Sequence, residues 1–343
     1  MPSSTMPFVL SARPLTLHEL RLAFEQPLHV SIDDDAWPAV HASHAAVQRL
    51  AAGNEPAYGI NTGFGLLANT RIALAERNHL QRNIVLSHSA GVGPLLDDAV
   101  VRLTLLLKVQ SFLRGYSGVS ESLIRLLARM LDAGLYPCVP SQGSVGASGD
   151  LAPLAHMSLP LIGLGSVRYE GRVLSGAQAL AQMGAQAIEL GPKEGLALLN
   201  GTQVSTSLAL AALFAVEQLI AASAVVGALA VDAMKGSDAP FDPRLHTVRG
   251  QPGQIAAAEI YRQLLAGSAI RRSHLENDER VQDPYSLRCQ PQVMGACLDL
   301  IVNSTRTLLI EANAVTDNPL VYADLDEIIS GGNFHAEPVA FAA

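Results

Sequence analysis

Residues 202–234 read TQVSTSLALAALFAVEQLIAASAVVGALAVDAM and form the most apolar stretch of the chain. Between Val204 and Val231 only Glu217 carries a charge, with the polar Gln218 beside it. A charge at the middle of a membrane span costs about 2.5–3.5 kcal/mol on insertion. The pattern therefore favours a helix buried on nearly all sides by other helices of a large assembly over a membrane span.

A second long helix is predicted from about Pro284 to Thr316, where Asn318-Pro319 follows. At 1.5 Å per residue, each of the two helices would be about 50 Å long. That length exceeds the radius of roughly 20 Å expected for a compact chain of this size. Helices of this length usually pack against partners from other subunits.

Shorter helices are marked by their capping residues. Thr16 and Glu19 form a capping box, Ser120 precedes a helix that closes at Gly134, and Asp97-Asp98 mark a further start. Strand signals are few, and residues 167–174 (VRYEGRVL) predict one small hairpin. We expect an all-α fold built around long helices.

Composition narrows the functional class. The chain has 343 residues, of which 49% are hydrophobic and 16% charged, and its net charge is -8. The basic surface of a nucleic-acid-binding protein is not expected. Three cysteines without a C-x-x-C motif argue against a disulfide framework or a zinc site, and no secretory leader is recognised at the N-terminus. We expect a cytoplasmic protein.

Few residues are suited to holding a metal or pyridoxal phosphate (PLP). Lys108, Lys193 and Lys235 are the only lysines, and none has a phosphate-binding motif nearby. His41 and His44 have the spacing of metal ligands, but no carboxylate or cysteine cluster accompanies them. We expect neither a metal nor PLP.

The most informative loop is residues 141–151, SQGSVGASGDL. Glycine and serine are ordinary loop residues, yet apolar sequence flanks this loop on both sides. A buried flexible loop would leave backbone polar groups without partners, so we expect its backbone to be rigid.

Two further patches combine polar and aromatic side chains. Tyr58 lies among glycines in a segment suited to a mobile lid or to a loop that carries a base, although an ordinary glycine turn fits equally well. Gln282, Tyr285 and Arg288 are spaced by three and could share a helical face, where the arginine could bind a carboxylate. Polar decoration of an exposed helix start is the alternative.

Residues 143–154, GSVGASGDLAPL, resemble the signature of the aromatic amino-acid ammonia-lyases, and the similarity is greatest to the histidine-specific branch. The resemblance runs from about Leu15 to the end of the chain. In this family an Ala-Ser-Gly tripeptide, here Ala147, Ser148 and Gly149, cyclises to 4-methylideneimidazole-5-one (MIO). The nitrogen of Gly149 attacks the carbonyl of Ala147, and two waters are lost. The product is a rigid, built-in electrophile.

The resemblance also implies a role for each matching residue. Tyr58 would take the β-proton, Asn200 and Tyr285 would support the ring and the substrate amine, and Arg288 would bind the α-carboxylate. Gln282 would line the pocket, Phe334 would pack beside the electrophile, and His88 would select the substrate side chain.

The resemblance implies an ammonia-lyase-type helical bundle, a homotetramer with shared active sites, and deamination of L-histidine to urocanate and ammonia. The expected division is an N-terminal helical region, 1–140, carrying the Tyr58 and His88 loops, and residues 141–343 with the MIO loop and an incomplete central bundle. Family members continue well beyond Ala343, so the chain is expected to be C-terminally truncated and to lack a pocket glutamate. Alternatives are a tyrosine ammonia-lyase, a 2,3-aminomutase, or a catalytically incomplete helical assembly module.

Overall fold

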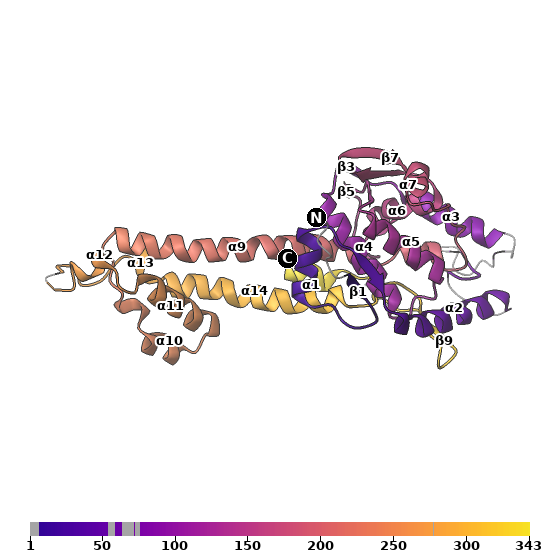
Figure 1. Cartoon of the computed structure of the whole chain (residues 1–343). Coiled ribbons are helices and arrows are strands. Elements are labelled where there is room, and N and C mark those ends of the chain that lie inside the picture. Colours follow the sequence, from indigo (N-terminus) through magenta and orange to yellow (C-terminus); the bar gives the residue numbers. More distant parts are fainter. Residues whose placement is uncertain (1–6, 54–58, 64–71, 73–75, 277) are drawn as a thin grey trace. The chain divides into compact units, whose positions relative to one another are not determined.

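The computed structural model describes residues 7–53, 59–63, 72, 76–276 and 278–343. The chain forms two compact units (Figure 1). The first contains residues up to 209 together with 308–341, and the second contains residues 210–307 with the last two residues. Helices predominate in the described residues, as expected for an all-α fold.

The first unit contains most of the helices. They are α1 (Leu17–Glu25), α2 (Trp37–Ala52), α3 (Arg77–His88), α4 (Asp98–Leu113), α5 (Glu121–Asp132), α6 (Leu151–Ser158), α7 (Gly176–Gln182), α8 (Glu194–Leu199) and α15 (Glu337–Ala342), with short 3-10 turns η1 (Asp34–Ala36) and η4 (Leu159–Ile162). The predicted caps are confirmed: Thr16 and Glu19 form a capping box on α1, and the Ser120 hydroxyl caps α5.

Helix α4 is the centre of the first unit. Every residue from Val100 to Leu113 is buried, including the charged Arg102 and Lys108. Helices α1 and α5 pack against it. A helix with no exposed face needs a partner for each of its polar side chains, so α4 must find these partners in the surrounding elements.

The strands form small sheets at the edge of this core. They pair as β1 (Phe8–Leu10) with β2 (Val30–Ile32), β3 (Val92–Leu95) with β5 (Pro140–Gln142), β6 (Ser166–Tyr169) with both β4 (Tyr136–Pro137) and β7 (Arg172–Ser175), and β8 (Leu320–Tyr322) with β9 (Glu327–Ile329). The predicted hairpin is confirmed by the β6–β7 pair, which turns at Glu170 and Gly171. The β3–β5 pair lies within the first unit.

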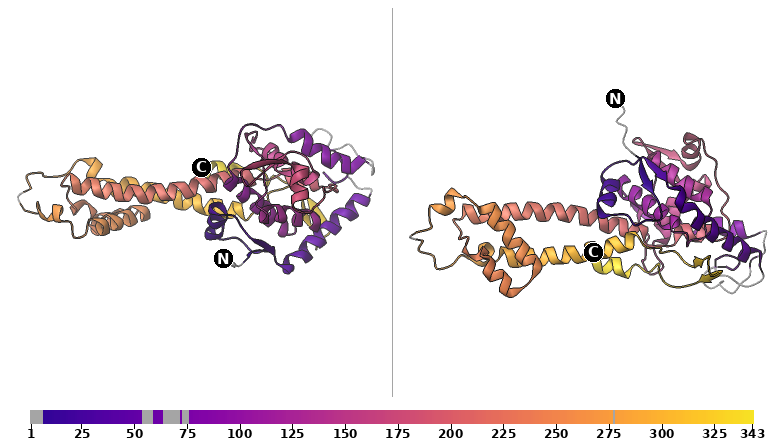
Figure 2. Two further views of the ribbon diagram at one scale, coloured as in Figure 1. Left: turned by 45° about the horizontal axis from the view of Figure 1, so that its top comes forward. Right: turned by 60° about the horizontal axis from the view of Figure 1, so that its bottom comes forward.

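In the described residues of the second unit, every secondary-structure element is a helix. After α9 (Gln203–Ala233), which begins in the first unit, come η5 (Ala239–Phe241), α10 (Pro243–Arg249), α11 (Pro252–Leu265), α12 (Ala269–Arg272), α13 (Tyr285–Arg288) and α14 (Gln290–Ala312). Its core joins Ala228, Val231, Phe241, Tyr261 and Leu265. Helices α9 and α14 run side by side in every view (Figures 1 and 2). A Cβ atom on Gly253 would lie 2.2 Å from the carbonyl oxygen of Gly295, so only glycine permits α11 to approach α14 so closely.

Of the two predicted long helices, the structure confirms one and contradicts the other. The first is confirmed, because α9 is continuous over 31 residues, or about 46 Å. The prediction of one helix over 284–316 is wrong, because the chain breaks at Cys289 between α13 and α14. Pro291 in the first turn of α14 lacks an N–H group and would clash with the carbonyl four residues earlier in a continuous helix.

Large apolar side chains lie exposed along both long helices. Val226 and Leu229 on α9 are 64% and 66% exposed, and Leu300 on α14 is 68% exposed. Residues 194–233 and 290–312 are long and apolar enough to span a membrane by length and composition alone, as are core helices of helical assemblies. The described part of the chain does not bury these side chains, and their burial in an assembly stays a prediction.

Candidate active site

The Ala147-Ser148-Gly149 tripeptide forms a tight turn between β5 and α6. Gly149 has a φ of +77°, and its N–H donates to the Gly146 carbonyl at 3.2 Å. The same carbonyl accepts a second bond, at 3.1 Å, from the N–H of Ala336. The turn is therefore held both from within and by a segment nearly 190 residues later in the chain.

The position of Gly149 excludes any side chain. A Cβ atom there would lie 2.5 Å from the carbonyl oxygen of Gly201 and 2.9 Å from its nitrogen. The N–H of Asp150 donates to the same Gly201 carbonyl at 2.8 Å. The left-handed φ and the close backbone approach both require glycine.

Asn200 reaches the tripeptide from the end of α8. Its Nδ2 atom donates to the carbonyl oxygen of Ser148 at 2.9 Å. Its Oδ1 atom is buried and has no hydrogen-bond partner in the described part of the chain. A buried acceptor without a donor is costly, and such groups often mark functional sites.

Asp150 anchors the end of the tripeptide. Its carboxylate is fully buried and accepts bonds from the Ser144 hydroxyl at 2.6 Å, the Ser205 N–H at 2.8 Å and the Ser205 hydroxyl. Ser205 lies in the first turn of α9, where the helix dipole favours a negative charge. Asp150 belongs to the signature, but no role was predicted for it, since spacing alone does not reveal its partner Ser205.

A pocket of about 380 Å³ lies beside the tripeptide. It brings together four predicted site residues from four parts of the first unit: His88, Ser148, Asn200 and Phe334. The remaining lining is apolar from α3, α6 and α8 (Ile84, Leu151, Leu196, Leu199) and polar around the β8–β9 hairpin (Asn318, Ser330, Gly331). An apolar pocket with a few polar groups is typical of a small-molecule site. The hairpin residues were not predicted, because no local pattern places them here.

His88 is the last residue of α3 and is half-buried. Its Nδ1 atom lies 2.8 Å from the carbonyl oxygen of Ile84. A carbonyl only accepts, so this contact places the proton on Nδ1 and leaves Nε2 of the neutral ring as an acceptor. The histidine can therefore receive a hydrogen bond from a polar group in the pocket.

One expectation about the signature loop is wrong. Residues 141–145 and 147–148 are exposed, and Val145 is 87% exposed, whereas a buried loop was expected. Burial begins only at Gly149 and Asp150, where the Gly201 backbone and Ser205 contact them. Flanking apolar sequence therefore did not predict burial of the loop itself.

Gln282, Tyr285 and Arg288 belong to the second unit. The expected shared helical face is wrong for Gln282, because α13 begins only at Tyr285. Arg288 donates from Nε to the carbonyl of Asp283 at 2.9 Å, and its guanidinium lies 4.5 Å from the centre of the Tyr285 ring. Gln282 and Arg288 line a pocket of about 330 Å³. Tyr285 is 73% exposed.

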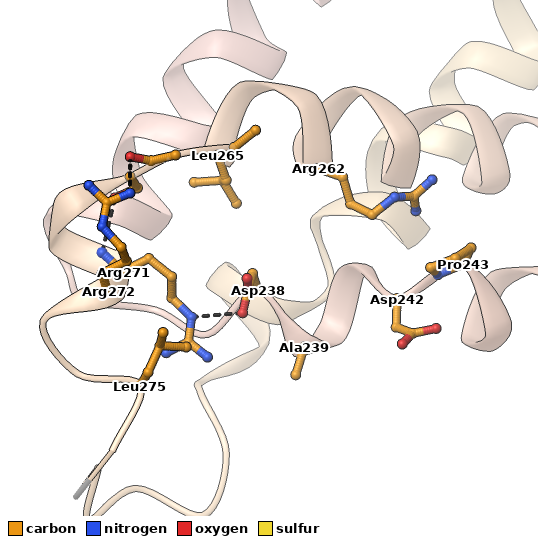
Figure 3. Close-up of a pocket in the computed structure, with 12 residues that line it drawn as sticks. Asp238, Ala239, Asp242, Pro243, Arg262, Leu265, Arg271, Arg272 and Leu275 are labelled. Carbon is orange, nitrogen blue, oxygen red and sulfur yellow. Dashed lines mark hydrogen bonds and ion pairs between the residues drawn. The ribbon is translucent and has the colours of Figure 1, made fainter.

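A further pocket, of about 500 Å³, also lies in the second unit but contains none of the predicted site residues (Figure 3). Its charged groups are paired within the protein. Arg271 binds Asp238 at 2.7 Å, Arg272 donates to the Gly267 carbonyl at 2.7 Å, and Arg262 donates to the Phe241 carbonyl at 2.7 Å. The arginines of this pocket therefore have partners within the protein, and no bound ligand is needed to explain their presence.

Tyr58 lies outside the described residues. Its neighbour Gly59 is described, and the Gly59 carbonyl accepts a bond from Nε2 of the buried Gln81 at 3.1 Å. Oε1 of Gln81 accepts in turn from the N–H of Leu196 at 3.2 Å. Gln81 thus joins the backbone beside Tyr58 to α8, the helix that carries Asn200.

Two lysines of the first unit are fully buried. Lys193 pairs with Asp317 at 2.6 Å, and Nζ of Lys108 donates to the carbonyls of Ala197 and Asn200 at 3.0 and 2.8 Å. Burial lowers the pKa of the Lys108 ammonium to about 7, while the charges of Asp317 and Asp150 raise it and that of Lys193 lowers it. Both lysines are already engaged by the protein.

His41 and His44, which have the spacing of metal ligands, have separate partners. His41 Nε2 lies 2.6 Å from Glu121, and His44 Nδ1 lies 3.1 Å from the Gly118 carbonyl. Among the described residues, no group of three or more metal-ligating side chains comes together.

A family model described as aromatic amino acid lyase matches residues 15–343, and the chain belongs to this family. Among curated relatives, histidine ammonia-lyase from Photobacterium profundum is 58% identical over 330 residues, which cover 96% of this chain and 64% of the relative. Histidine ammonia-lyase from Idiomarina loihiensis is 57% identical, covering 98% of this chain and 66% of the relative. The chain thus spans just under two thirds of the length of these relatives.

Solved structures share the fold. Tyrosine aminomutase from Streptomyces globisporus superposes with a TM-score of 0.90 at 34% identity, covering 98% of this chain and 66% of that one. Histidine ammonia-lyase from Trypanosoma cruzi gives a TM-score of 0.86 at 32% identity, covering 97% of this chain and 63% of that one. These neighbours support the prediction of an ammonia-lyase-type helical fold.

Proposed function

We propose that this chain acts in the non-oxidative deamination of L-histidine to urocanate and ammonia, using an MIO ring formed from Ala147, Ser148 and Gly149. The observation that carries the proposal is the pocket in which His88, Asn200 and Phe334 surround Ser148. These residues come from segments far apart in the sequence, so their convergence is independent of the signature itself.

The residues present fit the ring. The left-handed φ of Gly149 and the 2.5 Å that would separate a Cβ atom there from the Gly201 carbonyl oxygen explain why the third residue is glycine. Asn200 already holds the Ser148 carbonyl, and its buried Oδ1 needs a donor. Once formed, the ring supplies an electrophile that assists loss of the amine.

The substrate must be held so that its β-proton meets a base. We propose Tyr58 as that base, although its reference pKa of about 10 means that binding and the electrophile must assist the transfer. Arg288 is suited to bind the α-carboxylate, because a guanidinium presents parallel N–H donors. Tyr285 beside it would support the substrate amine, and Gln282 would line the pocket. Phe334 would pack against the ring.

Histidine is the proposed substrate for two reasons. The curated histidine ammonia-lyases are 56–58% identical to this chain. In addition, the Nε2 acceptor of His88 suits a side chain that carries an N–H group, such as imidazole. A phenol also carries a donor, so a tyrosine lyase or a 2,3-aminomutase is the alternative.

The predicted site residues fall in two units, with His88, Ser148, Asn200 and Phe334 in the first and Gln282, Tyr285 and Arg288 in the second. We propose a homotetramer in which neighbouring chains complete each site. The exposed apolar side chains of α9 and α14 support this assembly, because large exposed apolar patches mark interfaces. We also propose a cytoplasmic location. The three free cysteines fit a reducing compartment.

The test is product analysis with the purified chain. Incubation with L-histidine should give urocanate, which is followed by absorbance. L-Tyrosine is supplied separately, and coumarate or a β-amino acid identified by mass would favour the alternatives. In parallel, the intact mass should be two waters below the sum of the residues. Ser148→Ala removes the hydroxyl that leaves as water and should abolish this deficit.

The results separate the candidate functions. Urocanate together with the deficit supports the proposal. A deficit without turnover of any of these amino acids favours the helical assembly module. A full unmodified mass overturns the MIO-dependent function altogether.

A further inference from the structure

Lys108 occupies an unusual place for a lysine. It lies on α4, all of whose residues from Val100 to Leu113 are buried, and its side chain is fully buried. Burying a cationic side chain costs free energy unless hydrogen bonds and charges compensate. An apolar residue would fill the same space at lower cost, so the contacts of Lys108 need an explanation.

Those contacts lie on the segment that carries Asn200. Nζ donates to the carbonyls of Ala197 and Asn200 and lies 5.3 Å from the centre of the Phe112 ring. Ala197 is in the last turn of α8, and Asn200 is its C-cap residue. Carbonyls at a helix C-terminus lack helical partners, and a positive charge there is favourable.

Residues 200 and 201 contact the tripeptide and its neighbour Asp150 directly. The Asn200 side chain donates to the Ser148 carbonyl, and the Gly201 carbonyl accepts from the N–H of Asp150. The Gly201 backbone also lies against Gly149. Any shift of the chain at Asn200 would therefore displace all three of these contacts.

We propose that Lys108 is a positioning residue for the ring-forming tripeptide: by holding the main chain at Ala197 and Asn200, it sets the Asn200 amide against the Ser148 carbonyl. The inference rests on the proposed function, since it concerns formation of the MIO ring. Lys108 itself does not touch the reacting atoms. Its effect passes through Asn200.

The test measures ring formation by intact mass, independently of turnover. Lys108→Gln removes the positive charge and shortens the side chain, and Lys108→Arg keeps the N–H donors. Leu105→Ala is the control, because it shortens another fully buried side chain of the same helix. The fraction of chain lacking two waters is followed with time in samples of equal helicity by circular dichroism. Lys108→Gln should slow ring formation about tenfold, the factor for losing a hydrogen bond worth roughly 1.4 kcal/mol.

Lys108→Arg should restore at least half of the wild-type rate, and Leu105→Ala should form the ring at the wild-type rate. A double-mutant cycle then tests the route: added to Asn200→Ala, Lys108→Gln should cause no further slowing. If Lys108→Gln does not fold, Lys108→Arg alone tests the proposal. The proposal then requires that Lys108→Arg folds and still forms the ring.

Three results overturn the inference. The first is that Lys108→Gln does not slow ring formation, or that Lys108→Arg forms the ring at less than half the wild-type rate. The second is that Leu105→Ala slows ring formation as much as Lys108→Gln. The third is that the double variant forms the ring more slowly than Asn200→Ala alone. If the wild-type chain shows no deficit of two waters, the proposed function falls as well. A wild-type deficit with an unaffected Lys108→Gln overturns only the role of Lys108.

Discussion

The side-chain amide of Asn200 donates to the carbonyl oxygen of Ser148 at 2.9 Å, across 52 residues of sequence. This bond joins the end of α8 to the tripeptide at which the proposed chemistry takes place. The other polar atom of the amide, Oδ1, is buried without a partner among the described residues. Stability of the fold does not explain this arrangement, so we infer a functional role for Asn200.

Replacing Asn200 by alanine should therefore impair the site more than the fold. We expect kcat for L-histidine to fall about 100-fold, the scale seen when one preorganised donor is removed from an active site. Turnover is measured by urocanate absorbance, and helicity by circular dichroism. A variant with unchanged kcat would contradict the role of this amide.

Gly149→Ala should prevent ring formation, because its Cβ would collide with the Gly201 carbonyl. Backbone strain should also lower the free energy of unfolding by about 1–3 kcal/mol. Gly146→Ala is the matched control, since Gly146 has a similar φ of +81° but its nearest neighbour to a Cβ is 3.7 Å away. Intact mass should show the two-water deficit in Gly146→Ala and not in Gly149→Ala. Equal deficits in both would show that the close approach to Gly201 is unimportant.

His88→Phe should change substrate preference. The substitution removes the Nε2 acceptor from the pocket and leaves an apolar ring, so kcat/KM for L-histidine should fall about tenfold or more while that for L-phenylalanine rises. Steady-state rates with both amino acids measure the shift. Arg82→Ala serves as control, because Arg82 is exposed on the same helix and does not line the pocket. A preference ratio unchanged from wild type would exclude His88 as the selector.

His156 should make stability sensitive to acid. Burial lowers the pKa of His156, and its Nε2 accepts a bond from the N–H of Gly91 at 3.0 Å, which requires the unprotonated atom. The unfolded chain takes up this proton near the ordinary histidine pKa of about 6.5, and the folded chain only at lower pH. Between these values the unfolded state binds more protons, so the free energy of unfolding falls as pH is lowered.

Urea unfolding at about pH 7.5 and about pH 5.5, on either side of the ordinary histidine pKa, measures this effect. His156→Gln keeps an acceptor that does not titrate and should lose less stability between the two pH values than wild type. His18→Gln, at an exposed histidine of α1, should behave like wild type. Equal losses in wild type and His156→Gln would contradict the assignment.

Asp317→Asn should be strongly destabilising. It leaves Lys193 buried without its counter-charge, and breaking one partner of a buried pair costs about 3–5 kcal/mol. Asp326→Asn breaks the exposed pair with Arg49 and should cost no more than about 1 kcal/mol. The difference is read from urea unfolding midpoints. Similar midpoints for the two variants would show that the buried pair adds little.

Local features of the sequence predicted local structure well. The Thr16–Glu19 box, the Ser120 cap and the Glu170-Gly171 turn were all found as expected. Each depends on residues within about four positions of one another, so spacing alone is enough to predict them. The break at Cys289 was missed, because the helical pattern on both sides outweighed the signal of Pro291.

The amino-acid sequence by itself determined the helical character of the chain, its caps, and the position of the Ala147-Ser148-Gly149 tripeptide. Only the tertiary structure decided that His88, Asn200 and Phe334 meet at Ser148, and that Lys108 and Lys193 are fully buried. The physical reason is the range of the interactions. Caps and turns form between near neighbours, whereas the pocket and its buried charges arise from packing between segments separated by tens to hundreds of residues, which no spacing records.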